Sequence, residues 1–174
     1  MQAVNDGHEP MAVDFGEELS EVFSRGITAM REQDYPAAER AFGRVMKQTP
    51  PSHEHYSLLA SYLGLAQVLT GNEDGLLLCR DAASNEMLDG QVFLNLACAE
   101  WAMGNRKRTI DAIRRGVKVD AGNRQLNHAC AQLDCRRRCC FNFLPRGHRL
   151  NRFFGRLRRR PVEPPSVHSL LFSS

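Results

Sequence analysis

The sequence predicts an all-α protein built from consecutive helix pairs. Apolar segments of helix length alternate with short polar turns along most of the 174 residues. Small residues recur inside these segments, and the turns recur at a nearly constant interval. Such a period is typical of repeat proteins, in which each unit buries its apolar face against the next. The length and the 43% hydrophobic content suit one compact domain with tails.

The clearest unit runs from Val22 to Pro50, with the sequence VFSRGITAMREQDYPAAERAFGRVMKQTP. Gly26 and Ala38 are small at the point where two antiparallel helices would cross, and Phe42 would fill the space beyond them. Pro50 cannot continue the second helix. The segment therefore predicts one helix, a tight turn and a second helix.

The turn of this unit recurs twice. Asp34, Asn72 and Asn105 occupy equivalent turn positions, at intervals of 72 − 34 = 38 and 105 − 72 = 33 residues. Gly64 and Ala97 then fall on the small position that Gly26 holds in the first unit. The sequence therefore predicts three helix pairs in tandem.

This pattern resembles the tetratricopeptide repeat family over about residues 19–122. The family pattern is W-x2-L-G-x2-Y, then A-x3-F, then P, with a period of roughly 34 residues. Its positions are held in the first unit by Val22, Gly26, Ala29, Ala38, Phe42 and Pro50. The later units depart from it, with Leu76 and Arg80, then Thr109 and Ile113, where Ala and Phe are usual. The resemblance implies a right-handed helical solenoid of three helix pairs.

A seventh helix is expected to close the last pair. Asn123 is a candidate N-cap, and Leu126, Cys130 and Leu133 fall on one helical stripe. A repeat array needs such a capping helix, because its last unit otherwise exposes an apolar face. We expect the solenoid and its capping helix over residues 15–140, a flexible tail over 1–14, and a basic C-terminal arm and tail over 141–174. Residues 162–174 show no periodicity and are also expected to be flexible.

The resemblance further implies a concave groove lined by the first helix of each pair, with positions two, five, nine and twelve facing the ligand. The large apolar side chains at these positions are Phe23, Ile27, Met30, Leu58, Leu65, Val68, Leu94 and Trp101. They favour an apolar or amphipathic segment of another protein as ligand. Alternatively, the register is off by one and these side chains belong to the core. Only Arg31 and Asn95 approximate the family's carboxylate clamp, so no clamp is expected.

Charge divides the chain into an acidic body and a basic arm. Residues 1–134 hold 13 basic and 19 acidic groups, whereas residues 135–174 hold 23 − 13 = 10 basic and 20 − 19 = 1 acidic. Within RLNRFFGRLRRR, residues 149–160, Leu150, Phe153, Phe154 and Leu157 share one helical face. The arginines around this face are Arg149, Arg152, Arg156, Arg158, Arg159 and Arg160.

Two hypotheses account for this arm. We favour a lid that docks on the acidic body and covers the aromatic residues of the arm. The alternative is a surface helix that contacts an anionic membrane or an acidic protein. Nucleic acid is not an expected partner, because the arm has no Tyr or Trp for base stacking.

Enzyme signatures are missing from the sequence. It has no Walker lysine loop, no Gly-rich dinucleotide turn, no G-x-S-x-G and no paired His–Glu metal motif. We therefore expect no catalysis, no cofactor and no small-molecule substrate. His128, Cys135 and Cys139 fall on one helical stripe, where they cannot surround a tetrahedral ion, so no metal is expected either.

The remaining features favour a cytoplasmic protein. The N-terminal segment has no apolar run of the length that a secretion signal requires, so the six cysteines are expected to be reduced thiols. Cys79 and Cys98 fit small buried hydrophobic positions. The sequence thus predicts an adaptor or chaperone-like protein-interaction module. The alternative is a peripheral membrane-associating protein that uses residues 149–160.

Overall fold

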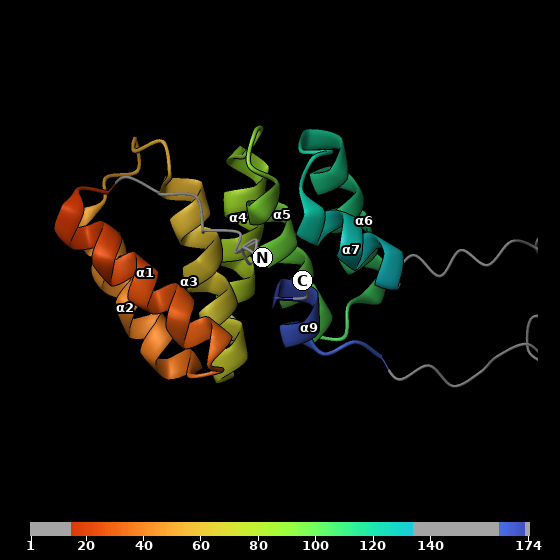
Figure 1. Ribbon diagram of the computed structural model, residues 1–174, viewed down its shortest axis with the longest axis horizontal. Coiled ribbons are helices and arrows are strands. Elements are labelled where there is room, and N and C mark those ends of the chain that lie inside the picture. Colours follow the sequence, from red (N-terminus) through yellow and green to blue (C-terminus); the bar gives the residue numbers. More distant parts are fainter. Residues whose placement is uncertain (1–14, 134–163, 173–174) are drawn as a thin grey trace, which may run out of the picture.

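The structure, a computed structural model, describes residues 15–133 and 164–172 (Figure 1). These residues form eight helices and no strand, so the predicted all-α fold is confirmed for them. The helices are α1 (Glu17–Arg31), α2 (Tyr35–Gln48), α3 (Tyr56–Thr70), α4 (Gly75–Asn85), α5 (Gly90–Ala102), α6 (Arg106–Val119), α7 (Arg124–Leu133) and α9 (Val167–Phe172).

Neighbouring helices pack in the order of the chain. The pairs α1 with α2, α3 with α4, and α5 with α6 are each in contact, and α3 also packs against α2 and α5. Helix α7 then packs on α5 and α6. Figure 1 shows the resulting array, which runs from α1 at one end to α6 and α7 at the other.

Polar turn residues set where the second helices begin. The Asp34 carboxylate accepts the backbone N–H of Ala37 at 3.0 Å and caps α2, and Asn105 is the N-cap residue of α6. In the middle pair, Asn72 lies two residues before the N-cap Asp74 and accepts its N–H at 3.1 Å. The predicted turns are therefore present, and the middle turn is longer than the others.

The predicted cap of the seventh helix is confirmed. Asn123 Oδ1 accepts the backbone N–H of Leu126 at 3.0 Å. Leu126 and Leu133 are buried, with Cys130 partly buried beside them. Residues 134–140 of the expected capping helix lie outside the described residues.

Small residues allow the paired helices to approach closely. A Cβ atom on Gly26 would lie 2.6 Å from Cε1 of Phe42, which confirms the predicted crossing of α1 and α2. A Cβ atom on Gly64 would lie 2.5 Å from the backbone oxygen of Gly75 and 2.8 Å from Cys79 Sγ. Backbone therefore meets backbone where α3 crosses α4.

The second-helix positions that depart from the family pattern still face inward. Leu76, Thr109 and Ile113 are buried, as are Ala38 and Phe42 in the first pair. The remaining position of this kind holds a charged residue, Arg80.

Arg80 reaches from α4 to a buried carboxylate on α5. Its Nε lies 2.8 Å from Oε1 of Glu100, whose side chain is only 3% exposed. Asn105 Nδ2 donates to the other oxygen of Glu100 at 2.8 Å. Both oxygens of the buried carboxylate are thus paired, which ties α4 and the start of α6 to the end of α5.

The expectation of a flexible tail is wrong for Val167–Phe172. This segment forms α9, in which Leu170 is 1% exposed and Leu171 is 3% exposed. A helix of six residues is too short to show a period in the sequence. The predicted tail over 1–14 and residues 141–163 of the predicted arm lie outside the described residues.

None of the described helices is both long enough and apolar enough to cross a bilayer.

Gly64→Ala should destabilise the protein, because the added Cβ meets backbone that cannot give way. We expect a loss of about 1–3 kcal/mol in the free energy of unfolding, measured by urea denaturation. Gly43→Ala on α2 is the matched control, since nothing lies within 4 Å of the new Cβ. Because alanine loses less conformational entropy than glycine on folding, that variant should be more stable by about 0.5–1 kcal/mol. Equal effects of the two substitutions would contradict the close crossing of α3 and α4.

Candidate functional site

The C-terminal segment 164–172 lies on the face formed by α5, α7 and the end of α1. Its helix α9 packs against α5 and α7. Figure 1 shows α9 between the α1–α4 part of the array and α7. We call this face, with its contacts from α1, α5 and α7, the inner face.

Trp101, near the end of α5, holds the start of the segment. Its indole Nε1–H donates to the backbone oxygen of Pro165 at 2.8 Å. The guanidinium of Arg106 lies 5.7 Å from the centroid of the Trp101 ring, a cation–π distance. The indole is therefore positioned by α6 while it binds a backbone carbonyl of the segment.

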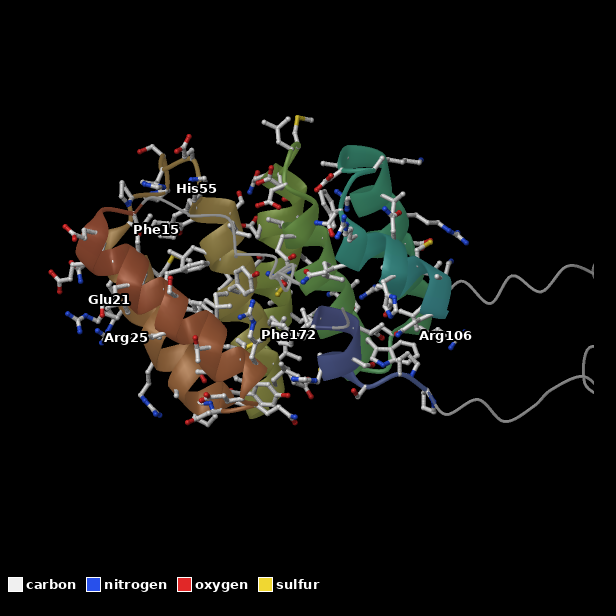
Figure 2. The ribbon with its side chains drawn as sticks, in the orientation of Figure 1. Phe15, Glu21, Arg25, His55, Arg106 and Phe172 are labelled. Carbon is white, nitrogen blue, oxygen red and sulfur yellow. The ribbon has the colours of Figure 1, made fainter. Side chains whose placement is uncertain are left out.

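Arg31, the last residue of α1, holds the other end. Its backbone oxygen lies 3.0 Å from His168 Nε2, and because a carbonyl can only accept, the ring nitrogen donates. Such a carbonyl at a helix C-terminus has no partner within its own helix. The Arg31 guanidinium lies 5.8 Å from the centroid of the Phe172 ring. In Figure 2, the labels of Phe172 and Arg106 lie on opposite sides of α9.

The segment carries its own helix start. Ser166 Oγ accepts the backbone N–H of Ser169 at 3.1 Å, and the Ser166 carbonyl accepts the N–H of Leu170 at 3.2 Å. Ser166 therefore acts as the N-cap residue of the short helix α9. This turn directs Leu170 and Leu171 into the core cluster of the body.

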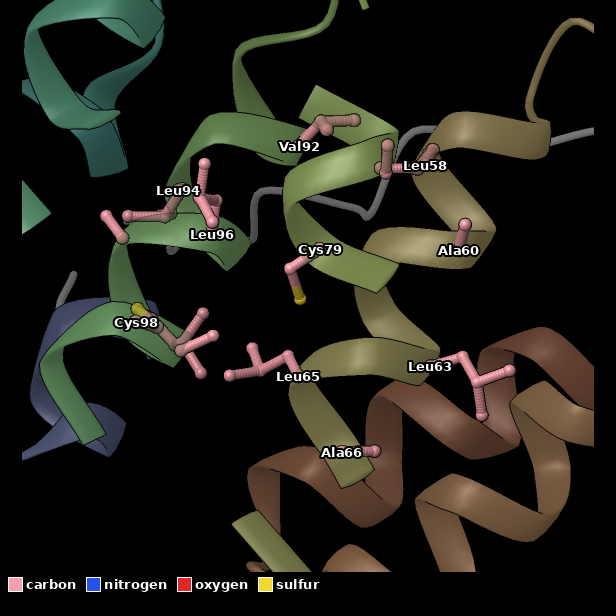
Figure 3. Close-up of a cluster of buried hydrophobic side chains, with 14 of the residues drawn as sticks. Leu58, Ala60, Leu63, Leu65, Ala66, Cys79, Val92, Leu94, Leu96 and Cys98 are labelled. Carbon is pink, nitrogen blue, oxygen red and sulfur yellow. The ribbon is translucent and has the colours of Figure 1, made fainter. Parts of the chain in front are cut away.

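The structure places the eight predicted groove residues mainly in the core. Seven are buried, namely Phe23, Ile27, Met30, Leu58, Leu65, Val68 and Leu94, and Trp101 is partly exposed. Figure 3 shows Leu65 pointing from α3 toward α5, where Cys98 lies close to α9. These seven side chains belong to the core cluster and do not lie open to an outside ligand. Trp101 contacts the C-terminal segment directly.

A chain of hydrogen bonds fixes α3 against α5 below this face. Gln91 Nε2 donates to Asn95 Oδ1 at 2.9 Å, and Asn95 Nδ2 donates to Ser61 Oγ at 2.9 Å. Ser61 Oγ in turn donates to the Leu58 carbonyl at 2.7 Å. Asn95 is fully buried and engaged at both ends, so a ligand carboxylate does not reach it.

An uncharged aromatic cluster joins α1, α2 and α3. The Tyr62 ring lies 5.5 Å from that of Phe23 and 5.4 Å from that of Phe42. Burial raises the pKa of the Tyr62 phenol well above its ordinary value, and the Asp89 carboxylate raises it further. Tyr62 therefore stays neutral and acts as a packing residue.

The two buried cysteines are structural. Cys79 and Cys98 are free thiols with no exposed surface, so their predicted role as small buried hydrophobes is confirmed. Burial raises the pKa of Cys79 to about 12 and also raises the pKa of Cys98. A thiol that does not ionise is a poor nucleophile and a poor metal ligand.

No cluster of metal ligands forms within the described ranges. The described residues hold no group of three or more His, Cys, Asp or Glu side chains placed to bind a metal. Cys135 and Cys139 lie outside these ranges. A shallow open depression lies between α6 and α7, lined by Ile110, Ile113, Arg114, Cys130 and Leu133.

Comparison with known proteins adds no family. No protein-family model matches the chain, and a search of curated proteins finds no match.

The residues of the segment itself were not among those that the sequence predicted. Pro165, His168, Leu170, Leu171 and Phe172 make or support its contacts with the body. The available signal was a serine followed by a pair of leucines, which is compatible with a capped helical turn. That signal does not show what the leucines pack against.

Leu170→Ala should release the segment from the inner face. Truncating a buried leucine costs about 2–5 kcal/mol, more than the roughly 1 kcal/mol net contribution of the indole hydrogen bond. Because Trp101 is the single tryptophan of the chain, its emission should shift to the red as the indole meets water. The exposed Pro164→Ala is the control and should leave the emission unchanged. An unchanged spectrum for Leu170→Ala would contradict this account of docking.

Proposed function

We propose that the protein is a non-enzymatic protein-interaction module whose inner face binds a short amphipathic helical segment of another protein. The proposal includes a tetratricopeptide-type right-handed solenoid and an adaptor or chaperone-like role in the cytoplasm. The tandem packing of three helix pairs and the close crossings at Gly26 and Gly64 support that architecture.

One observation carries the proposal, namely that the inner face already holds a helix from a distant part of the chain. The bound segment buries two adjacent leucines, Leu170 and Leu171, and gives a backbone carbonyl to Trp101. Helix-binding grooves in proteins use apolar anchors on one face of a short helix in this way. The inner face therefore has the chemistry of a helix-binding site.

The two buried thiols are compatible with a non-enzymatic module. Cys79 and Cys98 have raised pKa values and no access to solvent, so neither offers a reactive thiolate. The alternative of peripheral membrane attachment depends on residues 149–160, which lie outside the described residues, and it stays a prediction.

Selection from a library of displayed peptides of about ten residues tests the proposal. The bait is the full chain with Leu170→Ser and Leu171→Ser, which should vacate the inner face. We expect enrichment of peptides with apolar residues at helical spacing. Trp101→Ala, added to the bait, should weaken their binding by about 2 kcal/mol or more, as for a buried aromatic anchor.

Arg25→Ala in the same bait is the control, because Arg25 lies on α1 in an exposed pair with Glu21 (Figure 2). That change should leave peptide affinity unaltered. The proposal fails if no sequence is enriched, or if the enriched peptides bind the Trp101→Ala bait as tightly as its parent.

A further inference from the structure

We infer that residues 165–172 are a built-in competitor for the inner face, and that the outside partner displaces them with a segment of the same chemistry. That chemistry is an uncharged helix of one to two turns, led by proline, capped by serine, and carrying two adjacent leucines and an aromatic residue. This inference rests on the proposed function and names the ligand class and the regulation of the same site.

The segment is held by contacts with the body and not by its own helix. An isolated helix shorter than about 12–15 residues is marginal in water, and α9 has six residues. Its order therefore depends on the burial of Leu170 and Leu171, the Trp101 hydrogen bond and the contacts at Arg31. These are contacts that a second segment of like sequence can make in its place.

Displacement leaves the rest of the fold supported. The three helix pairs pack on one another independently of α9, and α7 has its own contacts with α5 and α6. The ion pair between Arg80 and Glu100 likewise fastens α4 to α5 without the segment. Loss of α9 uncovers the inner face and does not remove a link between consecutive helices.

The contacts that Trp101 and Arg31 make with the segment indicate which kind of ligand the inner face binds. Trp101 presents an N–H donor, which fits a free carbonyl just before a helix, as at Pro165. Arg31 presents a cation to an aromatic ring at the other end, as at Phe172. The sequence PPSVHSLLF, residues 164–172, carries no Asp, Glu, Lys or Arg. The site thus selects an apolar helix and makes no demand for a charged side chain.

Tethering makes this competition strong. A segment on the same chain competes in an intramolecular reaction, so its effective concentration does not fall when the protein is diluted. If the inner face is open in about one molecule in a hundred, the affinity for an outside peptide falls about 100-fold. The full chain is then a weak binder until the segment is released.

The test uses the synthetic fluorescent peptide PPSVHSLLFSS, residues 164–174, as the ligand. Its affinity is measured by anisotropy for the wild-type chain and for the full chain carrying Leu170→Ser and Leu171→Ser. We expect the double variant to bind at least about 10-fold more tightly, because its own segment no longer competes. Pro164→Ala, an exposed change in the same segment, should bind as the wild type does.

Phe172→Ala provides a second and milder variant. It removes the ring that faces Arg31 and keeps both buried leucines, so the fold should persist, as checked by far-UV circular dichroism. We expect a gain in peptide affinity of about 3-fold or more relative to the wild type. If the double variant is unfolded, this comparison decides the matter.

Three outcomes would overturn the inference. Equal affinity of wild type and folded variants would show that the segment does not compete. Failure of this peptide to bind a double variant that still binds library-selected peptides would leave the proposed function intact and reject the ligand class. A wild-type dimer that forms through exchanged segments, detected by light scattering, would mean that the competitor comes from a second copy.

Discussion

The close crossing of α3 and α4 at Gly64 and Gly75 is the constraint on which the rest of the array depends. Because neither residue has a side chain, the backbones of α3 and α4 come into close contact there. Helix α3 in turn contacts α2 and α5. The position of the first pair relative to the third is therefore set through this central crossing.

That arrangement brings two helix ends to one face. Arg31 ends α1, and Trp101 lies one residue before the end of α5, yet both contact the same nine-residue segment. The buried Glu100 precedes Trp101 and is held by Arg80 and Asn105. This polar cluster fixes the last turn of α5, so the indole is presented in one orientation.

The sequence predicted correctly those features that depend on residues close to one another along the chain. Gly26 against Phe42 and the Asn123 cap depend on residues close in sequence or in one repeat, and both predictions are confirmed. A substitution such as Arg80 could not be interpreted from the pattern, because its partner Glu100 is twenty residues away. The pattern showed only that an apolar residue was missing there.

The inner face required long-range information that no periodicity contains. Seven predicted groove residues lie in the core, because apolar side chains at these positions pack between helices as readily as they contact a ligand. The residue pairs that define the site, such as Trp101 with Pro165 and Arg31 with His168, are 64 and 137 positions apart. A helix of six residues leaves no periodic signal to mark it.

The central claim is that α9 is a displaceable ligand of the body, although Leu170 and Leu171 reach the core cluster. Hydrogen exchange of the backbone amides of Val167–Phe172, compared with those of α3 and α5 in the same wild-type chain, tests it most directly. The account predicts protection of α9 that is real but clearly lower than that of α3 and α5, since the segment opens while the helix pairs stay folded. Protection of α9 equal to that of α5, lost only on global unfolding, would contradict it.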